Sequence, residues 1–232
     1  MKSLVIIPTY NEAENVGPIT SEILRLTGED THVLIVDDNS PDGTAGIVKK
    51  LMASQPRLKL LSRPGKQGLG RAYVAAFKWG LENGYDVLVE NDADFSHRPV
   101  DLVKILAAVK DSDFVVGSRW VAGGATVNWG IGRKIISKGG SFYSRTILGY
   151  PIRDWTGGFN AWKRHVLQAI DLDTVRSEGY SFQIELKYRS LKKGFKGVEV
   201  PITFEDRRVG KSKMSLKIVL EAFVRVWGIR FS

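Results

Sequence analysis

The sequence YDVLVENDADFSHRP, residues 85–99, joins an apolar run to a cluster of acidic residues. The run YDVLV is nearly all apolar, as strands buried on both faces of a parallel sheet are. It is followed by two carboxylates one residue apart, Asp92 and Asp94. If the backbone stays extended, both point to the same side, and a divalent cation between them would relieve their repulsion. The alternative is that Asp94 caps the next helix while Asp92 faces water.

The same alternation of apolar strands and helical segments runs through the first half of the chain. We expect strands at 3–8, 32–37, 58–62, 85–90 and 113–117, and helices at 12–26, 42–52, 68–81 and 99–109. After a glycine-rich loop at 121–132, which we expect to be a mobile lid, the pattern predicts a helix at 133–148, a short strand near Phe159, a helix at 180–191, a strand at 198–204 and a terminal helix. This order predicts a single α/β domain with an open, mostly parallel, Rossmann-like sheet flanked by helices.

Polar clusters follow four of the expected strands: PTYNE (8–12), DDNSPDGT (37–44), ENDADFSH (90–97) and GSRW (117–120). In open α/β sheets the ligand site lies outside the carboxyl ends of the strands, so these clusters should meet at one edge. Their convergence favours the metal interpretation of Asp92 and Asp94 over the capping one.

Composition narrows the range of partners. The chain has no cysteine, which excludes disulfides and thiolate chemistry. Its 34 basic and 25 acidic residues indicate an anionic partner, with solubility as the simpler alternative; the excess lies mainly at 119–153 and in RRVGKSK, 207–213. Nucleic acid is not expected, because most aromatic residues lie within apolar runs and the acidic clusters would repel a phosphate backbone. No uncharged apolar stretch reaches the ~20 residues that span a bilayer.

A series of motifs runs in order along the chain: PTYNE, DDNSPDGT, RPGKQGLGRAY, DADFSH, GSRW, DWTGGF and DRRVGKSK. Together they resemble the dolichyl/polyprenyl-phosphate mannose synthases, which are family 2 glycosyltransferases with the glycosyltransferase-A fold. The resemblance covers residues 3–213. It implies a metal-dependent, inverting enzyme that transfers mannose from GDP-mannose to a polyprenyl or dolichyl monophosphate.

The end of the sequence indicates a division of the chain and a location. Residues 1–213 would form the catalytic domain. Residues 214–232, MSLKIVLEAFVRVWGIRFS, are apolar around most of a helix, with Lys217, Glu221 and Arg225 on one stripe. This pattern favours an amphipathic helix that contacts the membrane surface or a separate membrane-anchoring protein, with a helix packed on the domain as the alternative. We therefore expect a cytoplasmic protein, peripheral on the cytoplasmic face of a membrane.

The site residues that the resemblance implies fall into three groups. Asp92 and Asp94, with Ser96 at a position where some relatives have Gln, would hold Mg²⁺ or Mn²⁺ against the donor diphosphate. Arg119, Arg133 and Ser137 would receive the acceptor phosphate, and Asp92, Asp94 and Arg119 would carry catalysis. The nucleotide sugar would be bound by Pro8, Tyr10, Glu12, Val36, Asp38, Asp92, Ala93, Asp94, Arg119, Arg207 and Lys213.

Two other reactions fit the same motifs. A polyprenyl-phosphate glucosyltransferase that uses a UDP-sugar would need the same paired carboxylates, and the overall motif similarity favours mannose. Transfer to a saccharide hydroxyl would require a general base near the acceptor, for which Asp154 of DWTGGF is the candidate. The basic residues around Asp154 suit an anionic acceptor better.

Overall fold

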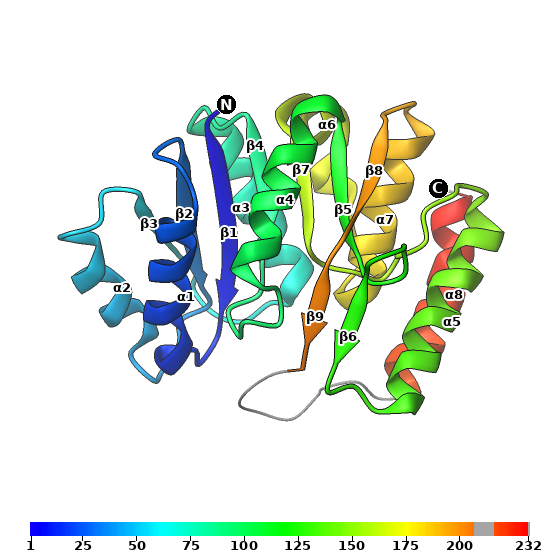
Figure 1. Cartoon of the computed structure of the whole chain (residues 1–232), viewed down its shortest axis with the longest axis horizontal. Coiled ribbons are helices and arrows are strands. Elements are labelled where there is room, and N and C mark those ends of the chain that lie inside the picture. Colours follow the sequence, from blue (N-terminus) through cyan, green and yellow to red (C-terminus); the bar gives the residue numbers. More distant parts are fainter. Residues whose placement is uncertain (207–215, 232) are drawn as a thin grey trace.

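The computed structural model describes residues 1–206 and 216–231. In this part of the chain, the main sheet has the strand order β3-β2-β1-β4-β7-β5-β8 (Figure 1). Its strands are β1 (Ser3–Thr9), β2 (Thr31–Asp37), β3 (Leu58–Ser62), β4 (Val87–Glu90), β5 (Phe114–Ser118), β7 (Asn160–Lys163) and β8 (Gly197–Pro201). β7 pairs antiparallel with β4 and β5, whereas the other neighbouring strands pair parallel. The predicted open, mostly parallel α/β sheet is confirmed.

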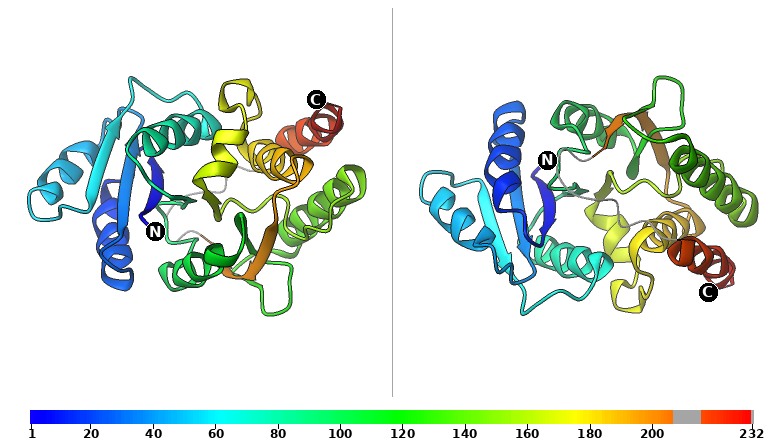
Figure 2. Two further views of the ribbon diagram at one scale, coloured as in Figure 1. Left: turned by 90° about the horizontal axis from the view of Figure 1, so that it is seen from above. Right: turned by 90° about the horizontal axis from the view of Figure 1, so that it is seen from below.

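Helices cover both faces of the sheet, as the views from above and from below show (Figure 2). One apolar cluster joins the sheet to α1 (Ala13–Leu26), α2 (Thr44–Met52) and α4 (Pro99–Ala108). A second cluster joins the opposite face to α3 (Leu69–Glu82), α6 (Arg164–Ala169) and α7 (Gly179–Lys192). The strands are therefore buried on both sides, which explains why their sequences are almost continuously apolar.

Two further helices, α5 (Ile131–Leu148) and α8 (Leu216–Arg230), lie side by side at one end of the sheet (Figure 1). A third apolar cluster fastens them to α7, with Leu148, Trp155, Ile184, Val226 and Ile229 among its buried members. The terminal helix therefore packs on the domain through one of its faces.

A small second sheet pairs β6 (Ala125–Val127) with β9 (Thr203–Glu205). Residues 198–204 were predicted as one strand, but the chain leaves the main sheet at Ile202. The Ile202 amide donates to the Ser118 carbonyl and the Ile202 carbonyl accepts from Ala125, so this residue links the two sheets. Its side chain is buried, and the sequence marks the change by Pro201, which ends β8 and has no backbone N–H to donate. The expected loop at 121–132 thus contains a strand.

Candidate active site

A cavity of about 320 Å³ opens at the carboxyl ends of the central strands and extends between α5, α7 and α8. It brings together residues that lie far apart in the sequence. Its lining includes Pro8, Glu12, Asp92, Ala93, Asp94, Ser96, His97, Arg119, Trp129, Arg133, Ser137, Thr156, Gln183, Phe223 and Val226. Asp92 and Asp94 follow β4, whereas the arginines and hydroxyl groups come from the residue after β5, from α5 and from the loop at 154–157; we call these two parts of the lining the acidic end and the basic end.

The two carboxylates converge through a turn rather than an extended strand. β4 ends at Glu90, and Phe95 has a positive φ of 62°. The Ser96 amide donates to Asp94 Oδ1 at 3.1 Å, and the Ser96 hydroxyl donates to Asp92 Oδ2 at 3.4 Å. The extended backbone considered from the sequence is therefore not what joins this pair, but the turn still places both carboxylates in the lining of the cavity.

His97 fixes the backbone at the start of this turn. The Asp92 amide donates to His97 Nδ1 at 3.0 Å, and the imidazole stacks on Phe159 with ring centroids 4.6 Å apart. Burial lowers the pKa of His97, although the carboxylates of Asp92 and Asp94 oppose this. The ring is therefore neutral near pH 7 and serves as a hydrogen-bond acceptor for the turn.

The donor set of this turn fits a hard divalent cation. Asp92, Asp94 and Ser96 offer oxygen ligands only, as Mg²⁺ and Mn²⁺ prefer. Within residues 1–206 and 216–231, no group of three or more His, Asp or Glu side chains could hold a metal ion by itself. Such a cation would depend on phosphate or water oxygens to complete its coordination, which is usual for Mg²⁺.

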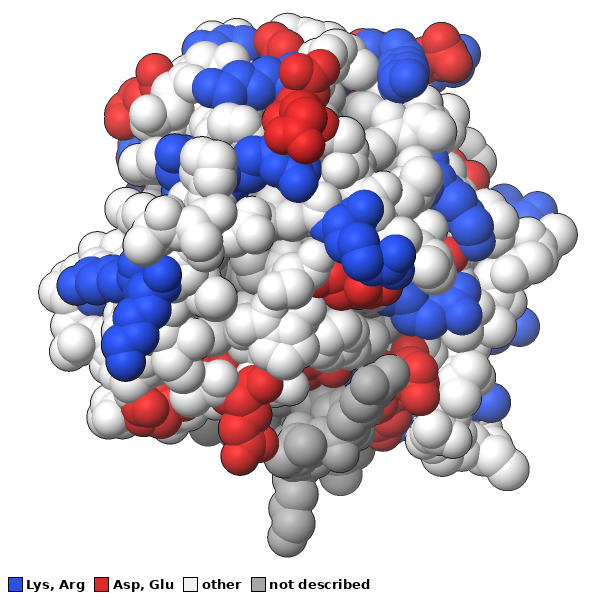
Figure 3. Space-filling model, turned by 60° about the vertical axis from the view of Figure 1, so that its left-hand side comes forward, with Lys and Arg blue, Asp and Glu red and all other residues white. Residues whose placement is uncertain are grey.

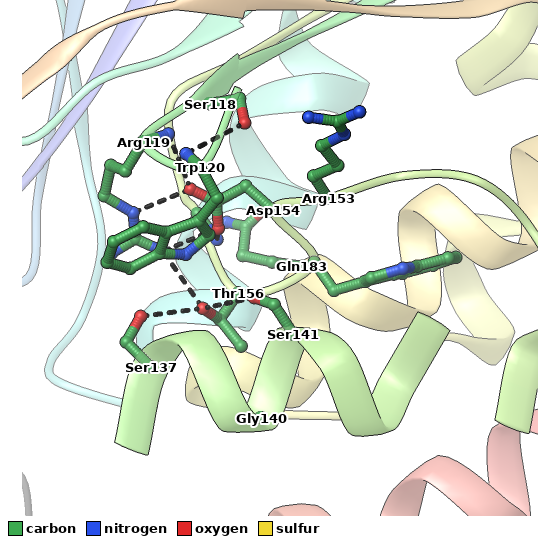
Figure 4. Close-up of polar contacts among 12 residues, drawn as sticks. Ser118, Arg119, Trp120, Ser137, Gly140, Ser141, Arg153, Asp154, Thr156 and Gln183 are labelled. Atoms are coloured by element: carbon green, nitrogen blue, oxygen red, sulfur yellow. Dashed lines mark hydrogen bonds and ion pairs between the residues drawn. The ribbon is translucent and has the colours of Figure 1, made fainter. Parts of the chain in front are cut away.

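Arg119 and Asp154 form a buried ion pair at the other end (Figure 4). Arg119 Nε and Nη2 donate to Asp154 Oδ2 and Oδ1 at 2.7 and 2.6 Å, in the two-pronged geometry that guanidinium and carboxylate favour. Burial raises the pKa of Asp154, but the charge and hydrogen bonds of Arg119 outweigh burial, and the net pKa is lowered. Asp154 is therefore a poor proton acceptor, which argues against its proposed role as a general base.

Hydroxyl groups surround this ion pair (Figure 4). Thr156 Oγ1 accepts from Arg119 Nη2 at 3.0 Å and lies 3.3 Å from the Ser137 hydroxyl and 3.4 Å from that of Ser141. Arg153 belongs to the same basic stretch of sequence, but its side chain points away from the pair (Figure 4).

Arg133 completes the basic end of the cavity from α5. Its guanidinium lies 4.0 Å from the centroid of the Trp129 ring and donates to Asp206 at 2.7 Å. Asp206 directly follows β9, so this contact ties the end of the small sheet to α5. An anionic ligand that binds here would compete with Asp206 for the same guanidinium.

Three of the expected nucleotide residues, Tyr10, Val36 and Asp38, lie on β2 or directly after β1 and β2, outside the lining of this cavity. Tyr10 is 39% exposed, with Lys66 Nζ 4.5 Å from its ring centroid. Asp38 is buried and paired with Arg63 at 2.5 Å, and burial raises its pKa although Arg63 opposes the shift. Val36 is fully buried in the core, so only its backbone can face a ligand. Arg207 and Lys213 lie outside the described residues, and the roles of all these residues stay predictions.

A buried polar layer beneath the cavity was not foreseen. Glu90 accepts from Trp162 Nε1 at 2.7 Å and from Gln183, while Lys187 donates to backbone carbonyls of the loop that contains Asp154. Burial raises the pKa of Glu90 to about 7, with the two hydrogen bonds opposing it. In the sequence, Lys187 resembles a solvent-exposed helical lysine, and nothing in its neighbours signals burial.

Residues 4–171 match the model of glycosyl transferase family 2. The chain belongs to this family. It is 50% identical to the undecaprenyl-phosphate mannosyltransferase of Micrococcus luteus over 99% of this chain and 95% of that protein. It is 48% identical to the polyprenol monophosphomannose synthase of Mycolicibacterium smegmatis over 99% of this chain and 88% of that protein. The dolichol-phosphate mannosyltransferase of Pyrococcus furiosus is 38% identical over 95% of this chain and 61% of that protein.

Comparison with solved structures at 15–16% identity supports the fold alone. Glucosyl-3-phosphoglycerate synthase from Mycobacterium tuberculosis in complex with UDP superposes with a TM-score of 0.70 at 15% identity, covering 99% of this chain and 80% of the other. The same protein in complex with Mn²⁺, UDP and glucosyl-3-phosphoglycerate gives a TM-score of 0.65 at 16% identity, covering 98% of this chain and 78% of the other. The glycosyltransferase-A fold expected from the sequence is confirmed.

Proposed function

We propose that this glycosyltransferase transfers mannose from GDP-mannose to a polyprenyl monophosphate, with inversion at the sugar C1. The observation that carries the proposal is the single cavity with Asp92 and Asp94 at one end and Arg119, Arg133 and Ser137 at the other. This arrangement suits one diphosphate and one monophosphate that face each other. The names of the relatives at 48–50% identity support the same acceptor and sugar.

At the acidic end, Asp92, Asp94 and Ser96 would hold Mg²⁺ or Mn²⁺. The metal ion would supply Lewis-acid stabilisation of the negative charge on the departing diphosphate. The protein's part is to fix the carboxylates, which it does through the Ser96 contacts and through His97 on the Asp92 amide. Glu12 and Pro8 line the same cavity and would contact the nucleotide sugar.

At the basic end, the phosphate group of the acceptor would itself be the nucleophile. A phosphate oxygen attacks C1, the C–O bond to GDP breaks, and the bonding electrons leave with GDP. A phosphate monoester is largely a dianion at neutral pH, so no proton has to be removed. Arg119, Arg133 and Ser137 would orient the phosphate by hydrogen bonds, and catalysis would rest on positioning and charge stabilisation.

The two competing reactions are less well supported than mannose transfer to a polyprenyl phosphate. Transfer to a saccharide hydroxyl needs a base, and Asp154 is an ionised partner of Arg119 with a lowered pKa. A polyprenyl-phosphate glucosyltransferase would use the same cavity. Mannose is preferred because the named relatives that cover nearly the whole chain are mannosyltransferases, whereas the UDP-bound neighbours share only the fold.

A lipid acceptor requires contact with a membrane. Apolar side chains are exposed along α5 and α8: Ile131, Ile135, Phe142, Val224, Trp227 and Phe231 are 49–80% exposed. No helix in the described part of the chain is long and apolar enough to cross a membrane. We therefore propose that residues 1–213 catalyse and that the helix within residues 214–232, with α5, lies on the cytoplasmic face of a membrane or on a membrane-anchoring protein.

Nucleic acid remains outside the proposal. Among the described residues on the face shown in Figure 3, Lys and Arg are interspersed with Asp and Glu and separated by uncharged surface. A backbone-binding surface would need a continuous basic stripe.

The donor can be identified by thermal unfolding with GDP-mannose, GDP-glucose, UDP-glucose and UDP-galactose, each with and without Mn²⁺. We expect GDP-mannose to give the largest rise in Tm, and only with the metal ion, because a ligand stabilises the state that binds it. The product with polyprenyl phosphate should have the β configuration. An α product, a trapped sugar–protein adduct or a preference for a UDP-sugar would each contradict part of the proposal.

A further inference from the structure

Lys187 of α7 is fully buried, and its ammonium group faces a loop rather than solvent. Nζ donates to the carbonyl oxygens of Asp154, Trp155 and Gly157, at 3.1, 3.1 and 2.7 Å. An ammonium has three donors, and these contacts use all of them. A single side chain thus gathers the carbonyls of a four-residue segment around one charge.

Burying an ammonium in this way is costly. Lysine is among the residues least often buried, and removal of its charge from water costs several kcal/mol unless other groups compensate. Burial lowers the pKa of Lys187 to about 8, although the charges of Asp154 and Glu90 oppose the shift. If the only requirement were a stable helix–loop contact, apolar packing would serve without this cost, so the lysine calls for another explanation.

The loop that Lys187 holds is the support of Arg119. Asp154 and Thr156 supply the oxygens that accept from the Arg119 side chain (Figure 4). Gly157 closes the loop by donating its amide to Asp154 Oδ1 at 3.0 Å, and a Cβ at this glycine would lie 3.2 Å from the same carboxylate. The loop leaves little room to shift without moving the carboxylate.

The outer side of the loop is fixed separately. The amides of Arg153 and Asp154 donate to the Glu199 carboxylate of β8 at 2.8 and 2.9 Å. Glu199 therefore holds the amides at the beginning of the loop, and Lys187 holds its carbonyls from beneath. Lys187, unlike Glu199, also contacts Gly157, the residue that follows Thr156.

We propose that Lys187 is a positioning residue for the acceptor phosphate: by gathering the carbonyls of Asp154, Trp155 and Gly157, it sets the Asp154 carboxylate and the Thr156 hydroxyl that orient Arg119. This inference rests on the proposed function, with Arg119 acting on the acceptor phosphate and not on the nucleotide sugar, the second role that the family resemblance implies for it. It assigns Lys187 no contact with either substrate.

The inference predicts different effects on the two substrates. The turn that carries Asp92 and Asp94 is held by Ser96 and His97, not by the loop at 154–157. Loosening the loop should therefore affect the acceptor far more than the donor. A merely structural lysine would instead reduce the amount of folded enzyme and leave both KM values unchanged.

The test compares Lys187→Met, which keeps the length without the charge, with Lys187→Gln, which retains two donors. Both are made in the full chain, with Ser190→Ala as the matched control. Ser190 is equally buried on α7, and its hydroxyl donates only to the Leu186 carbonyl at 2.8 Å. KM for polyprenyl phosphate, KM for GDP-mannose and the Kd of GDP with Mn²⁺ are measured, together with circular dichroism and Tm.

We expect Lys187→Met to raise the KM for polyprenyl phosphate ~10–100-fold, the scale of a misplaced orienting group. The donor KM and the Kd of GDP should stay within about twofold, as expected when only acceptor positioning is lost. Lys187→Gln should be intermediate, and Ser190→Ala should match the wild type. Equal changes in both KM values, or a loss of kcat alone, would overturn the inference, as would failure of both Lys187 variants to fold.

Arg119→Gln, measured in parallel, separates this inference from its premise. If Arg119→Gln leaves the acceptor KM unchanged, the proposed acceptor site is wrong and the inference fails with it. If Arg119→Gln raises the acceptor KM and Lys187→Met does not, the acceptor site stands and only the role of Lys187 is rejected.

Discussion

The two ends of the cavity are built in different ways. The acidic end comes from one turn, in which Asp92, Asp94 and Ser96 lie within five residues of each other. The basic end is assembled from β5, α5 and the loop at 154–157, and its ion pair spans 35 positions of sequence. A local turn needs little support beyond itself, whereas a composite site depends on every element that holds its parts. Mutations should therefore act locally at the first end and at a distance at the second.

Asp94→Ala should have the largest effect. Loss of a carboxylate from the metal-binding turn should lower kcat ~100–1000-fold, the cost of removing one preorganised electrostatic group. The Mn²⁺ dependence of GDP binding should disappear with it, and Asp92→Ala should behave similarly. The exposed Asp111 offers a control, because Asp111→Ala removes a carboxylate away from the cavity. Near-normal turnover of Asp94→Ala in EDTA would show that the acidic end has no metal role.

Asp154→Asn tests the composite end. Arg119 would lose its buried counter-charge, and breaking a buried pair on one side typically destabilises a protein by about 3–5 kcal/mol. The kcat/KM for polyprenyl phosphate should fall ~100-fold as the guanidinium loses its orientation, while GDP binding persists. Urea unfolding and steady-state kinetics measure both effects. If instead kcat fell with both substrates saturating, while the KM values for donor and acceptor stayed unchanged, Asp154 would be a catalytic group.

The same variant predicts a dependence on pH. The folded-state pKa of Asp154 lies below its ordinary value of 3.8, so its contribution to stability is complete above that value and is lost as the pH falls through the folded pKa. The stability difference between wild type and Asp154→Asn should thus be large at pH 7 and shrink at about pH 3. An equal difference at both values would mean that folding does not lower the pKa of Asp154.

How much of each end could be predicted follows from this contrast. The strands and helices of the first half are encoded in contiguous patterns, and the sequence predicted them well. The pair Asp92 and Asp94 is also visible in the sequence, but the turn that brings the two carboxylates together is not. Arg119, Arg133 and Ser137 were expected only from a family resemblance, because no local pattern links them. Asp154 was considered only as the base of an alternative reaction, and its ion pair with Arg119 was not foreseen because the two residues lie 35 positions apart. Lys187 was overlooked because burial depends on tertiary packing.

Arg133→Ala should have a smaller effect than Asp154→Asn. Removal of one of the cations should raise the KM for polyprenyl phosphate ~10-fold, about 1.4 kcal/mol, with donor KM unchanged. Arg133→Lys should restore part of this loss, because a point charge replaces a planar group that also stacks on Trp129. A variant with higher donor KM but normal acceptor KM would place Arg133 at the other end of the cavity.

The smallest expected effect lies outside the cavity, on α8. Replacing Trp227 and Phe231 by Ser removes exposed apolar area without touching the buried Val226 and Ile229. Sedimentation with anionic vesicles should weaken several-fold, while turnover of a detergent-dispersed acceptor stays normal. Val103→Ser on α4, which is 44% exposed, is the control. Unchanged vesicle binding would mean that α8 serves only to pack against α5 and α7.

The apolar side chains along α5 and α8 also affect self-association of the protein in solution. In a buffer without lipid, the side chains of Ile131, Ile135, Phe142 and Trp227 face water. Contact between copies of the chain would remove this apolar area from water. Self-association should then grow with protein concentration and with kosmotropic salt, which strengthens hydrophobic contact. A mild detergent should reverse it. The oligomeric state measured in solution would therefore depend on the buffer composition.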